Sequence, residues 1–205
     1  MNHATNDTRS QAAPRISALP GQPYPWYVRL IFALQRRKYG AELESARLWG
    51  RMPRAFLMLS LLYRALDRAD SPIDPALRAL VQVRISQINW CAFCVDLNSA
   101  TALERHVTQE KLAALAEYER SPLFNERERC VLAYAEAVTD PARPVDDATY
   151  ARLRGHFSEQ ESIEIAALIA FQNLSSKFNA ALAVPAQGFC TPGTAVRDAG
   201  ERRQK

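Results

Sequence analysis

Apolar residues recur at intervals of three and four positions along most of the chain between Pro25 and Ala183. This is the period of an amphipathic α-helix that buries one face. No stretch of four or more residues alternates between apolar and polar side chains as a half-buried strand would. The sequence therefore predicts an all-α fold of about seven to nine helices.

Prolines and capping residues divide this pattern into segments. Asp74 precedes Pro75 and is predicted to cap a helix that has proline in its first turn. Ser158 and Glu161 have the spacing of a capping box before the last apolar run. The predicted helices cover roughly residues 25–40, 53–66, 75–87, 91–106, 108–118, 125–138, 146–155 and 158–183.

A chain of 205 residues is long enough for one hydrophobic core and short for two. Residues 1–24 hold three prolines among small and polar residues, which predicts an extended or disordered N-terminal arm. Residues 25–190 are predicted to form a single helical domain. Residues 191–205 are predicted to form a flexible C-terminal tail.

Charge and hydropathy narrow the classes of partner. The net charge is +4, and basic and acidic residues are interspersed, which argues against a nucleic-acid partner. The longest apolar stretch, residues 55–63, is shorter than the ~20 residues of a membrane helix. The N-terminus lacks the apolar core of a signal peptide. We therefore expect a cytoplasmic protein with no membrane partner.

The candidate chemistry lies in a C-x-x-C sequence. Cys91 and Cys94 stand three residues apart at the start of a predicted helix, one turn from each other, so they can close a disulfide. The free N–H groups and the dipole of a helix N-terminus stabilise a thiolate. The functional interpretation is a dithiol/disulfide redox pair. Cys130 lies in an apolar run and is predicted to be a small buried hydrophobic residue.

Two other interpretations of the pair compete with this one. A zinc site needs further ligands, but His106 lies 12 residues after Cys94, ~18 Å along a straight helix, and there is no second C-x-x-C. We therefore expect no metal, and nothing in the sequence predicts another cofactor. On spacing alone, two buried cysteines without a function explain the motif as well as a redox pair does.

The residues around the pair, Val83-Arg-Ile-Ser-Gln-Ile-Asn-Trp-Cys-Ala-Phe-Cys-Val-Asp-Leu-Asn98, resemble the signature of the carboxymuconolactone decarboxylase and AhpD-like alkylhydroperoxidase superfamily. Residues 124–139 and 157–179 resemble two later blocks of the same superfamily, so the resemblance covers about residues 45–190. It implies an all-helical AhpD-like fold. It also implies a homo-oligomer, either a dimer, a trimer or a hexamer.

The resemblance also implies roles for the two thiols. In peroxidase members the second cysteine attacks the peroxide and the first resolves the product, which makes Cys94 the candidate peroxidatic thiol and Cys91 the resolving one. Those members have a proton relay of Glu, twelve residues before the first cysteine, and His, four residues after the second. Here Ala79 and Asn98 occupy these positions. Asn98 shares a helix face with Cys94 and can hydrogen-bond its sulfur.

Other charged residues could support the thiols. Asp96, two residues after Cys94, is expected to point to another side of the helix, as polar surface or as a charge near the helix start. Arg84 would favour a thiolate if its helix ran on, although the Asn-Trp pair before the first cysteine is expected to break it. Glu161 and Glu164 on the last helix are alternative bases.

The sequence therefore predicts an AhpD-like, peroxidase-related thiol oxidoreductase. Its C-x-x-C dithiol would reduce hydroperoxides or exchange disulfides, and an unidentified reductant would recycle it. The decarboxylase members of the superfamily work without the C-x-x-C, so both cysteines argue against that chemistry. The alternative is a catalytically weak or silent oligomeric member that binds a small apolar ligand between its helices.

Overall fold

The computed structural model describes residues 14–16 and 23–190, and within these ranges all regular structure is helical. The all-α class and the expected number of helices are therefore confirmed. None of these helices is both long and apolar enough to cross a lipid bilayer. The described elements are α1 (Trp26–Tyr39), α2 (Glu44–Trp49), α3 (Pro53–Leu66), α4 (Pro75–Ile88), α5 (Ala92–Glu104), α6 (Gln109–Ala113), the 3₁₀ helix η1 (Ala114–Glu117), α7 (Glu126–Thr139), α8 (Asp147–Arg154) and α9 (Glu159–Ala181).

The helices begin at the capping signals that the sequence carries. The Asp74 carboxylate accepts a hydrogen bond from the backbone N–H of Leu77 at 3.0 Å, and this caps α4. The capping box of Ser158 and Glu161 is formed at the start of α9, with each side chain accepting from the other's backbone N–H. These local interactions fix where the two central helices start.

Two helices differ from the prediction. The short helix α2 was not predicted, because its N-cap Leu43 offers no side-chain hydrogen bond and burial of Ser45, Ala46 and Leu48 stabilises it instead. The helix predicted over residues 108–118 begins at its expected cap, but it is divided into α6 and η1.

Part of the predicted N-terminal arm contacts the end of α9. The backbone N–H of Arg15 donates to the carbonyl of Leu182 at 3.0 Å, and its guanidinium donates to the carbonyl of Ala181 at 2.9 Å. The rest of the arm up to residue 22, and the tail predicted at 191–205, lie outside the described residues.

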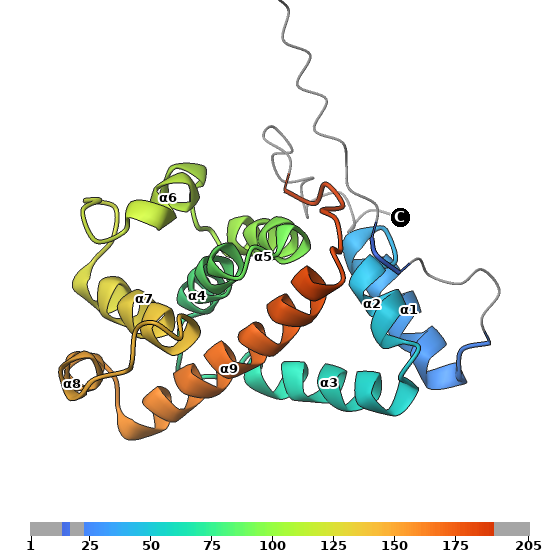
Figure 1. Ribbon diagram of the computed structural model, residues 1–205, viewed down its shortest axis with the longest axis horizontal. Helices are drawn as coiled ribbons and strands as arrows, with labels where there is room; N and C mark the ends of the chain where they lie inside the picture. The colour runs from blue at the N-terminus through green and yellow to red at the C-terminus, as the bar shows by residue number, and fades with distance from the viewer. Residues whose placement is uncertain (1–13, 17–22, 191–205) are drawn as a thin grey trace, which may run out of the picture.

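The buried apolar residues form two clusters. Figure 1 shows α9 running diagonally, with α4, α5 and α7 on one side, α3 on the other, and α1 and α2 near its C-terminal end. The first cluster centres on α4, α7 and the N-terminal half of α9, and it includes Cys130, which is buried as predicted. The second cluster joins α1, α2 and α3 to the start of α5, and it includes Cys91 and Cys94.

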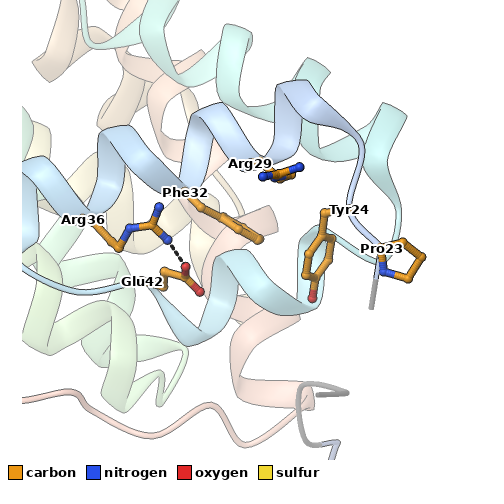
Figure 2. Close-up of a pocket in the computed structure, with 6 residues that line it drawn as sticks. All are labelled: Pro23, Tyr24, Arg29, Phe32, Arg36 and Glu42. Carbon is orange, nitrogen blue, oxygen red and sulfur yellow. Dashed lines mark hydrogen bonds and ion pairs between the residues drawn. The ribbon is translucent and has the colours of Figure 1, made fainter. Parts of the chain in front are cut away.

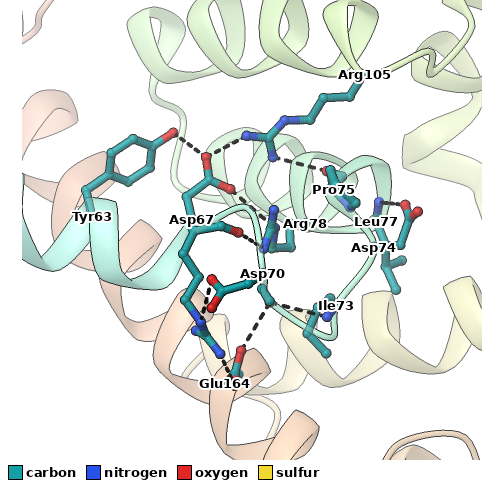
Figure 3. A network of polar contacts seen from close by, with 12 residues as sticks. Tyr63, Asp67, Asp70, Ile73, Asp74, Pro75, Leu77, Arg78, Arg105 and Glu164 are labelled. Carbon is teal, nitrogen blue, oxygen red and sulfur yellow. Dashed lines mark hydrogen bonds and ion pairs between the residues drawn. The ribbon is translucent and has the colours of Figure 1, made fainter.

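A network of buried charges fixes α3 against α4 and α5. Asp67, which ends α3, accepts hydrogen bonds from the hydroxyl of Tyr63 at 3.2 Å and from the guanidinium of Arg105 at 2.5 Å (Figure 3). The Nε of Arg78 lies 3.2 Å from the other carboxylate oxygen. Burial, and then the negative charge of Asp67, raise the pKa of Tyr63 well above its ordinary range, so this hydroxyl stays protonated and donates.

Candidate active site

Cys91 and Cys94 are joined by a disulfide at the start of α5, with their Cα atoms 5.2 Å apart. Cys91 is the N-cap residue, and its Sγ accepts a hydrogen bond from the backbone N–H of Cys94 at 3.1 Å. The chain enters this position through Trp90, whose φ of 53° is in the left-handed region. Trp90 is 90% exposed and so is not a core residue.

Both sulfurs are shielded from bulk water, because Cys91 is 1% exposed and Cys94 is 3% exposed. A residue from the far end of the chain completes the environment of the second. The side-chain amide of Asn179, near the end of α9, donates a hydrogen bond to Cys94 Sγ at 3.3 Å. The hydroxyl of Ser45 on α2 donates to the carbonyl oxygen of the same amide at 2.6 Å. Ser45 therefore holds the N–H side of the Asn179 amide toward the sulfur.

Asn179 belongs to a polar stripe on α9 together with Gln172 and Ser176, at positions i, i+4 and i+7. All three side chains are buried. Gln172 donates to the hydroxyl of Ser86 at 3.0 Å, and Asn89 donates to the hydroxyl of Ser176 at 2.8 Å. The stripe therefore fastens the end of α4 and the start of α5 to α9.

Neither Asn179 nor Ser45 is a predicted site residue, although both fall within the region of the family resemblance. The polar spacing on an otherwise apolar helix is the signal that could have drawn attention to α9. Nothing local in the sequence connects either residue to Cys94.

The expected hydrogen bond from Asn98 to the Cys94 sulfur is not among those of the described residues. Asn98 lies one turn after Cys94, and its amide donates to the hydroxyl of Ser86 at 3.1 Å. Ala79, in place of the relay glutamate, is fully buried in the first core cluster, whereas the cysteines belong to the second. The two substituted relay positions therefore hold a neutral amide and a methyl group.

The expectation that Asp96 is polar surface or a charge at the helix start is wrong. It is 8% exposed. Its Oδ2 accepts from the backbone N–H groups of Gln187 and Gly188 at 2.8 Å, and its Oδ1 accepts from that of Cys190 at 2.7 Å. The segment that follows α9 covers the face of α5 that carries Asp96. Asp96 anchors this segment.

The structure assigns Arg84 to a different contact from the expected one. Its guanidinium is 2.6 Å from the carboxylate of Glu136 on α7 and 3.2 Å from the amide oxygen of Gln87. The helix ends at Ile88, before the cysteines, as expected. The positive charge of Arg84 is therefore compensated by Glu136, and no contact joins it to either sulfur.

The two alternative bases lie at the wrong end of α9. Glu161 pairs with Arg127 at 3.0 Å, and Glu164 pairs with Arg68 at 2.7 Å. The hydrogen bond from Arg68 lowers the pKa of Glu164. Asn179, which contacts Cys94, lies 15 residues after Glu164 on α9. At 1.5 Å per residue, these two positions are about 22 Å apart along the helix axis. Neither glutamate can act as the base for Cys94 within one protomer.

An apolar groove of about 730 Å³ is lined by residues that flank Cys94, and neither cysteine is itself in the lining. Its walls come from α1, α2, α3, α4, α5 and α9, and most of the lining side chains are aromatic or aliphatic. Phe93, Leu97 and Asn98, which flank Cys94 on α5, line this groove, and so does Ser45. The groove is therefore bounded in part by the neighbours of the candidate reactive sulfur.

A second cavity, of about 500 Å³, lies on the other face of α1. Figure 2 shows its lining, in which the guanidinium of Arg36 pairs with the carboxylate of Glu42 beside the rings of Phe32 and Tyr24. None of Phe93, Leu97 and Asn98, which flank Cys94, lines it. It is separate from the candidate active site.

Comparison with known proteins identifies the family. The model of the carboxymuconolactone decarboxylase family matches residues 53–137. The uncharacterized protein YnjA of Escherichia coli K12 is 44% identical over 179 residues, which are 86% of this chain and 94% of YnjA. The chain belongs to the carboxymuconolactone decarboxylase family. The match to the family model runs from the start of α3 into α7, so it does not include Ser45 or Asn179.

Solved structures share the fold. The debrominase Bmp8 superposes with a TM-score of 0.72 at 26% identity, covering 80% of this chain and 88% of Bmp8. The uncharacterized peroxidase-related protein of Ralstonia eutropha JMP134, an alkylhydroperoxidase AhpD core, superposes with a TM-score of 0.76 at 24% identity, covering 87% and 96% of the two chains. The fold is AhpD-like, as the resemblance in the sequence implied.

Proposed function

We propose that this protein is a thiol oxidoreductase that uses Cys94 and Cys91 to reduce hydroperoxides or to exchange disulfides. The observation that carries the proposal is the pair itself: a disulfide at a helix N-terminus in which one sulfur accepts a backbone N–H and the other accepts the N–H of Asn179. Each donor would stabilise a thiolate in the reduced protein. A peroxidase-related role at the level of the superfamily agrees with the family and the fold.

The proposed cycle has three steps. The Cys94 thiolate attacks one oxygen of ROOH, the O–O bond breaks, and uptake of one proton gives ROH and a sulfenic acid. The Cys91 thiol then attacks the sulfenic sulfur, an S–S bond forms, and water leaves with the proton of that thiol. Two equivalents of an external thiol, R′SH, restore both cysteines by exchange and leave as R′SSR′.

Cys94 is the better candidate for the attacking thiol, for two reasons. Its neighbours Phe93, Leu97 and Asn98 line the groove, so a substrate in the groove approaches this end of the pair. Asn179 donates to its sulfur from a fixed orientation. Cys91 lies behind it as the N-cap residue, within bonding distance, which suits the resolving thiol.

The missing relay sets an expectation for the rate. General acid–base assistance typically contributes about 10²–10⁴-fold. Asn98 can donate a hydrogen bond but cannot move a proton near neutral pH, and Ala79 offers no polar group. We therefore expect slower peroxide turnover than in family members that have both relay residues.

The proposal is tested by counting thiols after oxidation. Reduced protein is mixed with one equivalent of tert-butyl hydroperoxide, and the products are identified by peptide mass spectrometry. We expect two of the four thiols per chain to be lost as a Cys91–Cys94 disulfide. Cys94→Ser should abolish the reaction, and Cys91→Ser should leave a sulfenic acid on Cys94 that dimedone traps. Cys130→Ser is the matched control, because that thiol is buried in the other core cluster.

One result would reject the assigned roles, and another would reject the function. If Cys91→Ser abolishes oxidation and Cys94→Ser does not, the roles of the two thiols are reversed. If neither thiol reacts faster than free cysteine at the same pH, the protein is not a hydroperoxide reductase.

The second candidate function is ligand binding without catalysis. The apolar groove of about 730 Å³ favours it, because this volume lies within the usual range of small-molecule sites. The near-complete burial of both sulfurs also favours it, since a silent pair needs no access. The thiol count separates the two candidates, because a silent binder would retain all four thiols after exposure to peroxide.

A further inference from the structure

The charged groups that line the groove all have one sign. Lys38 on α1 and Arg64 on α3 are its only charged lining residues in the described part of the chain, and neither Asp nor Glu lines it. Both side chains are exposed, and neither pairs with a carboxylate among the described residues. Two uncompensated cations at the edge of an apolar cavity favour a ligand that carries a negative charge.

The two cations each stand near the C-terminal end of their helix. Lys38 is followed by Tyr39 at the end of α1, and Arg64 is preceded by Tyr63 near the end of α3. Both Tyr39 and Tyr63 line the groove, as do the two cations beside them in the sequence. The positive charges therefore meet the groove at the C-terminal ends of α1 and α3.

Inside the groove, two amide side chains offer polar groups to a ligand. Gln82 on α4 is only 2% exposed and lines the groove. The side-chain oxygen of Gln35 on α1 is buried, lines the same groove, and has no hydrogen-bond partner in the described structure. Buried amide groups normally have partners, so the Gln35 oxygen points to a polar atom of a ligand, and Gln82 places a second amide on the groove wall.

The remaining lining fits a hydrocarbon body. It includes side chains such as Tyr27, Ile31, Trp49, Phe56 and Phe171, from three helices around the cavity and from α9. A ligand that satisfies the whole groove is therefore amphipathic, with an anionic head, a long apolar body, and an oxygen substituent on that body.

We propose that the groove binds a long-chain fatty acid, with its carboxylate at Lys38 and Arg64 and an oxygen substituent on its chain at the Gln82 amide. The reducible substrate would then be a fatty acid hydroperoxide. The identity of this substrate rests on the proposed thiol chemistry, whereas the binding of the fatty acid does not. Gln82 lies one turn before Ser86, to which Asn98 donates from α5. An oxygen at Gln82 is therefore on the side of the groove that adjoins Cys94.

Binding is measured on the full chain with Cys91→Ser and Cys94→Ser, so that no thiol chemistry contributes. Decanoate, decanol and decylamine are titrated calorimetrically below their aggregation limits. We expect decanoate to bind about tenfold or more tightly than the alcohol or the amine, because hydrogen bonds to charged groups are the stronger ones. Lys38→Ala with Arg64→Ala should remove this preference. Arg37→Ala with Arg54→Ala is the matched control, since it removes two cations from the same helices outside the groove.

A second comparison tests the role of Gln82. The probes are stearate and 12-hydroxystearate, the stable alcohol that corresponds to a reduced hydroperoxide. We expect the hydroxy acid to bind more tightly to the double cysteine variant, and Gln82→Leu should remove the difference while stearate still binds.

Three results would overturn the inference. The first is equal binding of decanoate, decanol and decylamine. The second is a preference for decanoate that does not diminish after Lys38→Ala with Arg64→Ala. The third is a groove occupied by a second copy of the chain. The last would appear as an oligomer that binds no probe and dissociates on Leu34→Glu. In each case, oxidation of Cys94 by tert-butyl hydroperoxide would still test the thiol chemistry, so the two proposals fail separately.

Discussion

Asn179 offers the sharpest test of how the protein controls its thiols. Its amide donates to Cys94 Sγ at 3.3 Å, and the Ser45 hydroxyl holds the amide in that orientation at 2.6 Å. Asn179 is fully buried, so water cannot replace its N–H group at the sulfur. Removing the donor should therefore make the Cys94 thiolate harder to form in the reduced protein.

The size of the effect follows from the hydrogen bond. A bond to a charged group contributes about 1.5–3 kcal/mol net, and one pH unit in a thiol's titration corresponds to about 1.4 kcal/mol. We therefore expect the pH midpoint of Cys94 alkylation to rise by about one to two units. Asn179→Ala alone would leave the buried Ser45 hydroxyl unpaired and a cavity behind. Asn179→Leu with Ser45→Ala removes both partners, which is nearly neutral for stability when shape is kept.

The assay is the rate of iodoacetamide alkylation against pH, in a Cys91→Ser background and resolved by peptide mass spectrometry so that only Cys94 is followed. Asn173→Leu is the matched control. It makes the same substitution on the same helix, where Asn173 bonds to Thr139 and Asn89 and not to a sulfur. Its midpoint should equal that of the parent protein. An unchanged midpoint in the Asn179 double variant would refute the stabilising role of this amide.

The remaining predictions concern stability, the end of the described chain and assembly. Trp90→Gly should raise the urea unfolding free energy by about 1 kcal/mol, because glycine adopts a left-handed φ without strain; a loss of stability would contradict this. Burial first, and then the charge of Asp96, raise the pKa of the Cys190 thiol, so Asp96→Asn should lower that pKa and speed alkylation of Cys190 at pH 8. An unchanged rate would count against it. Met58 and Leu62 are exposed one turn apart on α3, outside the groove, so we expect the protein to form a homo-oligomer. Light scattering should show an oligomeric mass that falls after Met58→Glu with Leu62→Glu. A monomeric parent protein would exclude this homo-oligomer.

The sequence was sufficient to predict the features of the fold that depend on near neighbours. The caps at Asp74 and Ser158 and the disulfide at Cys91 and Cys94 each involve residues three apart. The helix α2 was missed because its stability comes from burial against other helices rather than from a local signal.

The site depends on contacts that no local pattern contains. Asn179 lies 85 residues from Cys94, and Ser45 lies 134 residues from Asn179. The helical spacing predicted that Asp96 lies on a different side of α5 from Cys94. It could not indicate that the segment after α9 folds back to cover that side and donates three backbone N–H groups to the carboxylate.

The loss of the relay has a consequence for the pH dependence. The side chains that hydrogen-bond around Cys94 are those of Asn179, Ser45 and Asn98, and none of them titrates between pH 4 and 10. The rate of Cys94 oxidation by tert-butyl hydroperoxide should therefore rise with pH through one ionisation, that of the thiol, and then reach a plateau. A relay would add further ionisations and a descending limb.

Restoring one member of the relay tests this directly. Asn98→His places an imidazole one turn from Cys94 and should raise the oxidation rate at pH 7, by up to about 10²-fold, and add a second ionisation to the profile. Ala79→Glu is the poorer choice, because that position is fully buried in the first core cluster, where an unpaired carboxylate is costly. Stopped-flow oxidation of both proteins, in the Cys91→Ser background, separates the possibilities. A wild-type profile that already shows two ionisations would mean that a base outside the described contacts of this protomer serves Cys94, and the interpretation of neutral amides in place of the relay would be wrong.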